Sequence, residues 1–128
     1  MVIRIADPKV FRLHAEFCKV LANPTRLMII ALLHQSELSV GELASAMATA
    51  QTTTSQHLRV LRERGIVEAR KEGQTVFYKL TDPRLMEACV IIRKVLLDKM
   101  KALGNTASEL DPQGVSSAEN ALHGIVSN

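Results

Sequence analysis

The stretch "TTTSQHLRVLRERGIV", from Thr52 to Val67, decides the fold of this chain. It opens with small hydroxyl side chains, which compete for backbone hydrogen bonds and are poor helix formers. Leu58 and Leu61 nevertheless recur at helical spacing, with arginines between and beyond them. Gly65 then supplies a helix C-terminal signal. The stretch therefore predicts a helix that begins with short polar side chains and ends with basic ones.

Two helices are predicted before this stretch, each where a proline follows a capping side chain. The first begins at Asp7-Pro8 and the second at Asn23-Pro24, because proline is favoured at the first position of a helix. Residues 34–38 are polar enough for a turn. The first helix continues with apolar residues at helical spacing: Val10, Leu13, Phe17, Val20 and Leu21.

A third, short helix is predicted to begin after Ser39, with Glu42 three residues later as its capping-box partner. The break at residues 48–50 separates this helix from the one in the opening stretch. A short helix, a three-residue break and a hydroxyl-rich basic helix together form a helix-turn-helix.

After Gly65 the apolar period changes from helical to alternating. Residues 66–80 predict a β-hairpin with Glu72-Gly73 as its turn, which would form a wing beside the helix-turn-helix. Asp82-Pro83 opens a last helix of about 20 residues. The predicted apolar stripe of that helix comprises Leu85, Cys89, Ile92, Leu96 and Leu103. The predicted fold class is mainly α with a two-stranded β wing (α+β), a winged helix-turn-helix in the order α-α-α-α-β-β-α.

Composition agrees with one helical domain followed by a tail. Of the 128 residues 47% are hydrophobic, yet only 3% are aromatic and none is Trp, so the core must be aliphatic. The formal charge is +3 overall, but residues 105–128 carry −3 and residues 1–104 carry +6. A basic body is compatible with binding a polyanion. We therefore expect a DNA-binding and dimerisation domain over 1–104 and an acidic, flexible tail over 105–128.

Several classes of protein are disfavoured by the sequence. It has no apolar run of membrane-spanning length and no apolar signal block, which predicts a cytoplasmic protein without a membrane partner. Two cysteines do not make a disulfide framework in a reducing compartment. No paired carboxylates, glycine-rich phosphate loop or nucleophile with a nearby base stands out. We therefore expect no enzyme, no catalytic residue and no cofactor.

Double-stranded DNA is the partner that the helix-turn-helix and wing predict. Side chains at the start of a recognition helix reach base edges in the major groove, where Gln can pair with adenine and Ser or Thr with several bases. The alternatives are a solvated helix or a protein-interaction module, but the segment 59–79 keeps a charge of +3. The predicted DNA-binding residues are Gln51, Thr52, Thr53, Ser55, Gln56, Arg59, Arg62, Arg70, Lys71 and Gln74.

Four segments in order, "VLANPTRLMIIALL", "ELSVGELA", "QTTTSQHLRVLRERGIV" and "GQTVFYKL", resemble the signature segments of the ArsR/SmtB repressors. The resemblance implies a homodimer, joined through its first and last helices, that leaves its operator on binding a metal or on thiol chemistry. It also implies that His57 contacts phosphate, with a partly buried histidine as the equal alternative. Ala50 and Thr54 depart from the family pattern, which usually has Ser at the first position and an apolar residue at the second.

The inducer is less clearly indicated. The two metal sites common in the family are absent, because Ser39 and Gly41 replace the cysteines of one and no His occurs between Gly65 and Gly104. The remaining candidates are His14, Cys18 and Cys89. The cysteine pair predicts either a thiol switch responding to oxidants or reactive sulfur, by analogy with relatives, or simple packing. His14 is better explained by packing, and a metal or metalloid bound by these three residues is the third alternative.

Overall fold

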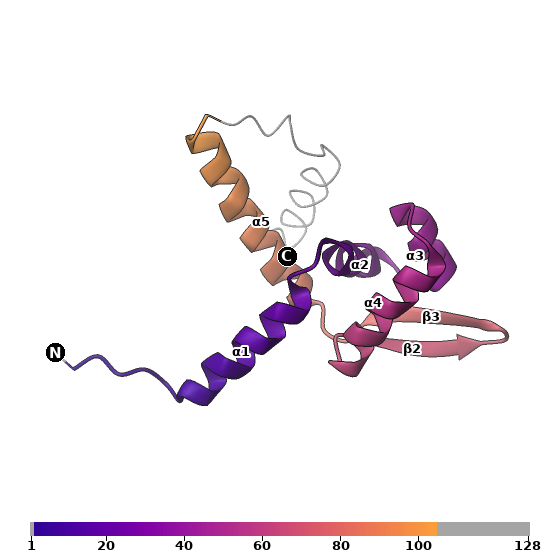
Figure 1. The fold of residues 1–128 in the computed structure, drawn as a ribbon, viewed down its shortest axis with the longest axis horizontal. Helices are drawn as coiled ribbons and strands as arrows, with labels where there is room; N and C mark the ends of the chain where they lie inside the picture. Colours follow the sequence, from indigo (N-terminus) through magenta and orange to yellow (C-terminus); the bar gives the residue numbers. More distant parts are fainter. Residues whose placement is uncertain (1, 105–128) are drawn as a thin grey trace. The chain divides into compact units, whose positions relative to one another are not determined.

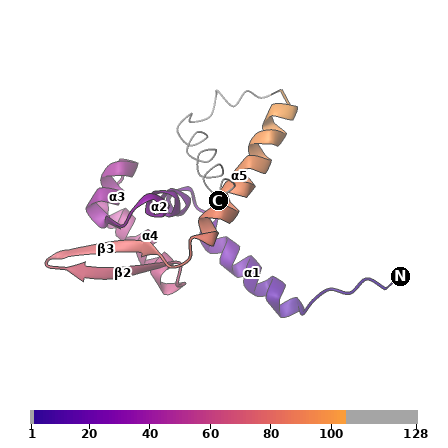
Figure 2. The same ribbon diagram turned by 180° about the vertical axis from the view of Figure 1, so that it is seen from behind.

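The structure is a computed structural model that describes residues 2–104, so the predicted acidic tail lies outside the described residues. The chain divides after Thr81 into two compact units. The first contains α1 (Pro8–Leu21), α2 (Pro24–Gln35), β1 (Leu38–Ser39), α3 (Val40–Met47), α4 (Gln51–Glu63), β2 (Val67–Glu72) and β3 (Thr75–Leu80), and the second contains α5 (Arg84–Ala102). Figure 1 and Figure 2 show the helices of the first unit and the long β2–β3 hairpin that extends from them.

The predicted starts of the first two helices are confirmed. The Asp7 carboxylate accepts a hydrogen bond from the backbone N–H of Lys9 at 3.0 Å, and the Asn23 side chain accepts one from the N–H of Arg26 at 3.2 Å. These bonds satisfy N–H groups that lack partners within the first helical turn. Over residues 2–104 no single helix is long and apolar enough to cross a membrane. The pair α1 and α2, bent by 88° at their junction, reaches that length and apolar composition only when the two helices are taken together.

The helix-turn-helix is built from α3, a short break and α4. Ser39 and Glu42 form the predicted capping box: the Ser39 hydroxyl accepts from the Glu42 N–H at 3.1 Å, and the Glu42 carboxylate accepts from the Ser39 N–H at 3.0 Å. Ala48 ends α3 in the left-handed conformation, with φ of +51°. The break at residues 48–50 then leads into α4, as the sequence predicts.

The sheet has three antiparallel strands in the order β1-β3-β2, one more than predicted. The extra strand is only two residues long, with Leu38 opposite Tyr78 and Ser39 opposite Phe77. These residues lie between α2 and α3, in and just after the segment predicted to be a turn. The middle of β3 is therefore paired to the segment that begins the helix-turn-helix.

The hairpin turn lies one residue later than predicted. Glu72 is opposite Thr75 in the ladder, so Gly73 and Gln74 form a two-residue turn. Gly73 has a φ of +61°, which suits glycine at the first position of such a turn. At the other end of the hairpin, the Thr81 hydroxyl donates to the carbonyl of Gly65 at 2.6 Å. This bond ties the end of β3 to the segment that follows α4.

An aliphatic core holds α4 in the first unit. Leu58 and Leu61 on α4 are at most 1% exposed. Thr54, one turn earlier, is fully buried, and its hydroxyl donates to the Ala50 carbonyl at 3.0 Å. That bond satisfies the buried Thr54 hydroxyl at a position where the family pattern usually has an apolar residue. Further buried members of this core are Ile29, Ile30, Leu33, Leu43, Ile66 and Val67.

The predicted stripe on α5 lies along one side of the helix, and three of its five residues, Ile92, Leu96 and Leu103, are exposed. Met86, Cys89 and Val90 are buried, whereas Ile92 is 66% and Leu96 55% exposed. Of the predicted stripe, only Cys89 is fully buried. Met86 and Val90 lie on an adjacent side of α5. That the stripe joins the first and last helices of two subunits stays a prediction.

Candidate nucleic-acid interface

The start of α4 separates polar from buried side chains. Thr54, Leu58 and Leu61 are buried, while the polar residues on the other side are exposed. Ala50 is the N-cap residue of α4, and its side chain makes no hydrogen bond to the N–H groups of the first turn. Free N–H groups at a helix N-terminus favour anions. The exposed predicted residues on α4 are Gln51, Thr52, Thr53, Ser55, Gln56, Arg59 and Arg62.

Gln51 lies close to the start of α3. Its Nε2 atom is 3.5 Å from the point where a Cβ on Gly41 would lie. A methyl group at position 41 would make ordinary van der Waals contact with the Gln51 side chain, so this spacing does not require glycine. This proximity places Gln51 at the junction between the two helices of the helix-turn-helix, at the edge of the exposed polar face.

His57 is half-buried and takes part in a contact that the sequence analysis missed. Its Nδ1 atom accepts a hydrogen bond from Nε of Arg26 at 3.2 Å, and Nη1 of Arg26 donates to the Val20 carbonyl at 3.0 Å. Burial, and secondly the charge of Arg26, lower the pKa of His57 below the usual histidine value. Both effects favour the neutral imidazole. A phosphate contact through its other nitrogen stays a prediction.

Arg59 and Arg62 occupy the exposed later part of α4. Arg59 contacts Glu63 at 3.3 Å, but both side chains are more than half exposed, so this i,i+4 pair stabilises the helix only weakly. Its guanidinium can exchange this partner for a phosphate at little cost. Among the described residues, Arg62 has no ion pair.

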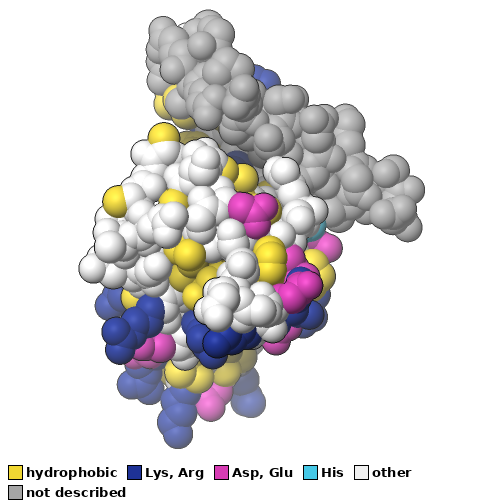
Figure 3. All heavy atoms as spheres, turned by 90° about the vertical axis from the view of Figure 1, so that its right-hand side faces the viewer, with side chains coloured by type: hydrophobic (Ala, Val, Ile, Leu, Met, Phe, Trp, Pro, Cys, Tyr) yellow, Lys and Arg dark blue, Asp and Glu magenta, His cyan; other side chains and the backbone are white. Residues whose placement is uncertain are grey.

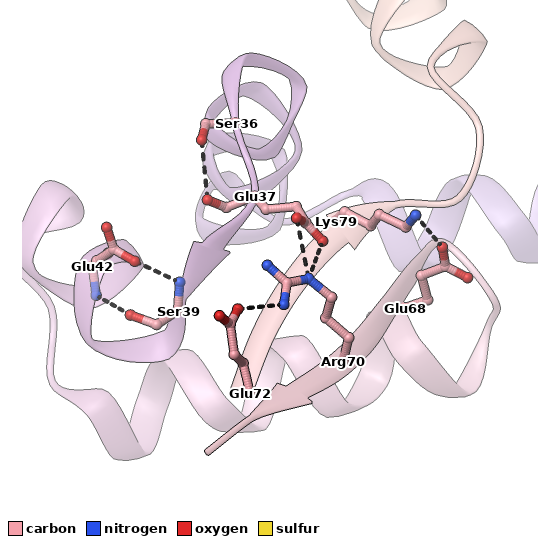
Figure 4. Close-up of polar contacts among 8 residues, drawn as sticks. All are labelled: Ser36, Glu37, Ser39, Glu42, Glu68, Arg70, Glu72 and Lys79. Atoms are coloured by element: carbon pink, nitrogen blue, oxygen red, sulfur yellow. Dashed lines mark hydrogen bonds and ion pairs between the residues drawn. The ribbon is translucent and has the colours of Figure 1, made fainter. Parts of the chain in front are cut away.

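Arg70 on the wing is surrounded by acidic side chains, as Figure 4 shows. Its Nε donates to Glu37 at 3.0 Å, and its Nη1 donates to Glu72 at 2.6 Å. The guanidinium carbon also lies 4.9 Å from the centre of the Phe77 ring. The bond from Arg70 holds the pKa of Glu37 below its usual value. The predicted phosphate contact is therefore already occupied by carboxylates, one of them 33 residues away in sequence.

The tip of the wing is more open. Lys71 and Gln74 are both exposed, and over residues 2–104 no ion pair involves Lys71. Lys79 pairs with Glu68 across the ladder at 3.1 Å. Figure 3, viewed from the side of Figure 1 where the hairpin tip lies, shows Lys and Arg side chains gathered in the lower part of this face with acidic ones among them. The wing is thus a mixed surface in which some basic groups are already paired.

The two cysteines have different environments in different units. Cys18 is exposed on α1, as is His14 one turn before it. Cys89 is buried on α5, and burial raises the pKa of its thiol, while the charge of Arg93 acts the other way. Over residues 2–104 no three His, Cys, Asp or Glu side chains are grouped so that they could hold a metal ion.

Comparison with known proteins identifies the family. Residues 23–69 match the model described as "Bacterial regulatory protein, arsR family". The biofilm growth-associated repressor of Agrobacterium fabrum is 48% identical over 81 residues, which cover 61% of this chain and 69% of that protein. The transcriptional activator HlyU of Vibrio cholerae is 43% identical over 77 residues, which cover 60% and 71%.

A solved structure agrees in fold. It is the homodimeric winged helix-turn-helix DNA-binding domain of a Mycobacterium bovis protein, which is 33% identical and matches with a TM-score of 0.63. The match covers 77% of this chain and 95% of that one. The helix-turn-helix of α3 and α4 and the β2–β3 hairpin are thus the motif and wing of a winged helix-turn-helix. The chain belongs to the arsR family of transcriptional regulators.

Proposed function

We propose that this regulator is a cytoplasmic, sequence-specific transcriptional repressor that binds an operator through the first turn of α4. The observation that carries the proposal is the arrangement of that turn: exposed polar side chains on one face and the buried Thr54, Leu58 and Leu61 on the other. Fixed polar groups on a rigid helix are what base reading in the major groove requires.

Repression is the proposed sign of the effect. Among the relatives, the Agrobacterium protein is named a repressor and the Vibrio protein an activator. Selection of bound sequences from a random DNA library identifies the operator, and a reporter gene placed behind it measures the sign. We expect removal of the regulator to raise reporter transcription. A fall in transcription contradicts repression, and failure to enrich any sequence contradicts operator binding.

We propose that the protein binds its operator as a homodimer joined through α1 and α5, as the Mycobacterium bovis domain is homodimeric. The two helices carry large exposed apolar side chains that a partner subunit would cover. On α1, Leu13 is 67% exposed, and on α5 the Ile92 side chain is 66% exposed. A twofold dimer would match a palindromic operator with half-sites about one helical turn apart, or a multiple of it.

Sedimentation measures this association directly. We expect a dimer at micromolar concentration for the unmodified chain and a monomer for Leu13→Glu and Ile92→Glu, because each buries a charge in the proposed interface. Lys94→Glu, also on α5, is the matched control and should leave the dimer intact. If the unmodified chain sediments as a monomer, the proposed dimer is contradicted.

The wing allows a sharper prediction about salt dependence. Lys71→Ala should flatten the plot of log affinity against log salt by about 0.9, the value for one lost phosphate contact. Arg70→Ala should flatten it less, because Glu37 and Glu72 already neutralise that guanidinium. Gln74→Ala, at the same tip, removes no charge and is the control that should leave the salt slope unchanged. Equal changes for Arg70→Ala and Lys71→Ala would show that the carboxylates release Arg70 to the DNA.

A thiol switch is the proposed means of release from the operator, with Cys18 and Cys89 as its residues. Exposure of Cys18 makes the first thiol accessible to an oxidant. Burial of Cys89 limits access to the second.

A further inference from the structure

Arg26 bonds to two helices at once. It lies in the first turn of α2 and is half-buried. Its Nη1 donates to the Val20 carbonyl near the end of α1 at 3.0 Å, and its Nε donates to Nδ1 of His57 on α4 at 3.2 Å. All three helices belong to the first compact unit. A single guanidinium therefore bridges α1 and the recognition helix.

The bond to His57 determines where the imidazole proton lies. A guanidinium has only donors, so Nδ1 must present its lone pair and the proton must be on Nε2. Arg26 thus fixes one tautomer and one ring orientation. The Nε2–H remains as the donor of a side chain that directly follows Gln56, one of the proposed base-reading residues.

The bond to Val20 attaches the end of α1. The last carbonyls of a helix lack partners within it, and Arg26 satisfies one of them. Val20 is the buried residue of α1, whereas His14, Phe17 and Cys18 are exposed. Movement of this end of α1 must therefore shift the guanidinium or break its bond.

We propose that Arg26 is a positioning residue for DNA recognition, which couples the end of α1 to the recognition helix by holding His57 as the Nε2–H tautomer. The proposal rests on the proposed operator binding by α4. It assigns Arg26 no direct contact with DNA. A change at α1 would reach the base-reading face through this bridge.

The test uses Arg26→Lys, which keeps the charge but lacks the planar fork of donors, and His57→Ala, which removes the acceptor. We expect each to lower operator affinity by about tenfold. In the double variant the two losses should not add, because Arg26 is proposed to act on recognition only through His57. Arg12→Lys, on an exposed part of α1, is the matched control. Additive losses would overturn the coupling of Arg26 to His57.

Two NMR readouts separate positioning from general stability. In the unmodified protein without DNA, the His57 nitrogens should show a protonated Nε2 and an unprotonated Nδ1, and Arg26→Lys should give a mixture. A protonated Nδ1 in the unmodified protein overturns the proposal even if a variant fails to fold. Addition of operator DNA should shift the Val20 backbone signals in the unmodified protein but not in Arg26→Lys, and equal shifts would overturn the coupling to α1. If no operator binds at all, the proposed function fails, while the tautomer still tests the bridge.

Discussion

Replacing Ser55 and Gln56 together with alanine is expected to reduce the preference for operator over random DNA by about 2–6 kcal/mol. The estimate takes two base contacts of about 1–3 kcal/mol each. Both side chains are exposed on α4, so their removal leaves no buried polar group unpaired. Alanine also favours the helix, so the fold should be retained. Competition binding with operator and random duplexes at one fixed salt concentration measures the difference.

The pattern across variants matters more than any single affinity. The Ser55/Gln56 double variant should leave binding to random DNA nearly unchanged, whereas Lys71→Ala should weaken binding to both duplexes. Ser45→Ala, on the exposed side of α3, is the control for loss of a surface hydroxyl. The assignment of roles is wrong if the wing variant changes sequence preference while the α4 variant leaves it intact.

The local part of this interface could be predicted from sequence because each signal lies within a few residues. Leu58 and Leu61 are spaced to bury one face of α4, and the intervening polar residues must then face outward. Ser39 and Glu42 specify the start of α3 through bonds across three residues. The capping box specifies α3, and apolar spacing specifies α4 although its first turn has poor helix formers and no side-chain cap, so the helix-turn-helix follows from the sequence.

The long-range part could not be predicted in this way. The Arg26–His57 bond joins residues 31 apart, and the Arg70–Glu37 bond joins residues 33 apart. Nothing in the local pattern around Arg26 or Glu37 indicates a partner. The two-residue strand β1 likewise owes its existence to pairing with β3. These contacts decide which polar residues of the predicted interface are already engaged, which composition alone does not reveal.

Oxidation by peroxide or polysulfide is expected to lower operator affinity about 5- to 150-fold, the effect of a coupling of about 1–3 kcal/mol. With peroxide, the Cys18 and Cys89 thiols together lose two electrons and two protons to form a disulfide, and the peroxide is reduced to water. A bond between α1 and α5 would alter the packing of the proposed dimer interface. The spacing of the two recognition helices would then no longer match the groove repeat of about 34–36 Å.

The environments of the two thiols predict an order of reaction. Cys18 is exposed and should react first, whereas Cys89 is buried with a raised pKa and should form thiolate sparingly at neutral pH. Alkylation of the reduced protein should therefore label Cys18 faster, and labelling of Cys89 should accelerate as pH rises. Cys18→Ser and Cys89→Ser variants assign the two rates. Equal rates at neutral pH would contradict the protection of Cys89.

Operator binding before and after treatment decides whether the thiols act as a switch. Unmodified protein should lose affinity on treatment and regain it on reduction, while Cys18→Ser and Cys89→Ser should keep full affinity throughout. If treated protein binds as tightly as reduced protein, or if both single variants still respond fully, the cysteines are packing residues. Release that persists in Cys89→Ser but not in Cys18→Ser would place the chemistry on the exposed thiol alone. In that outcome a modification of α1 would suffice, and the Arg26 bridge at its end gives it a route to α4.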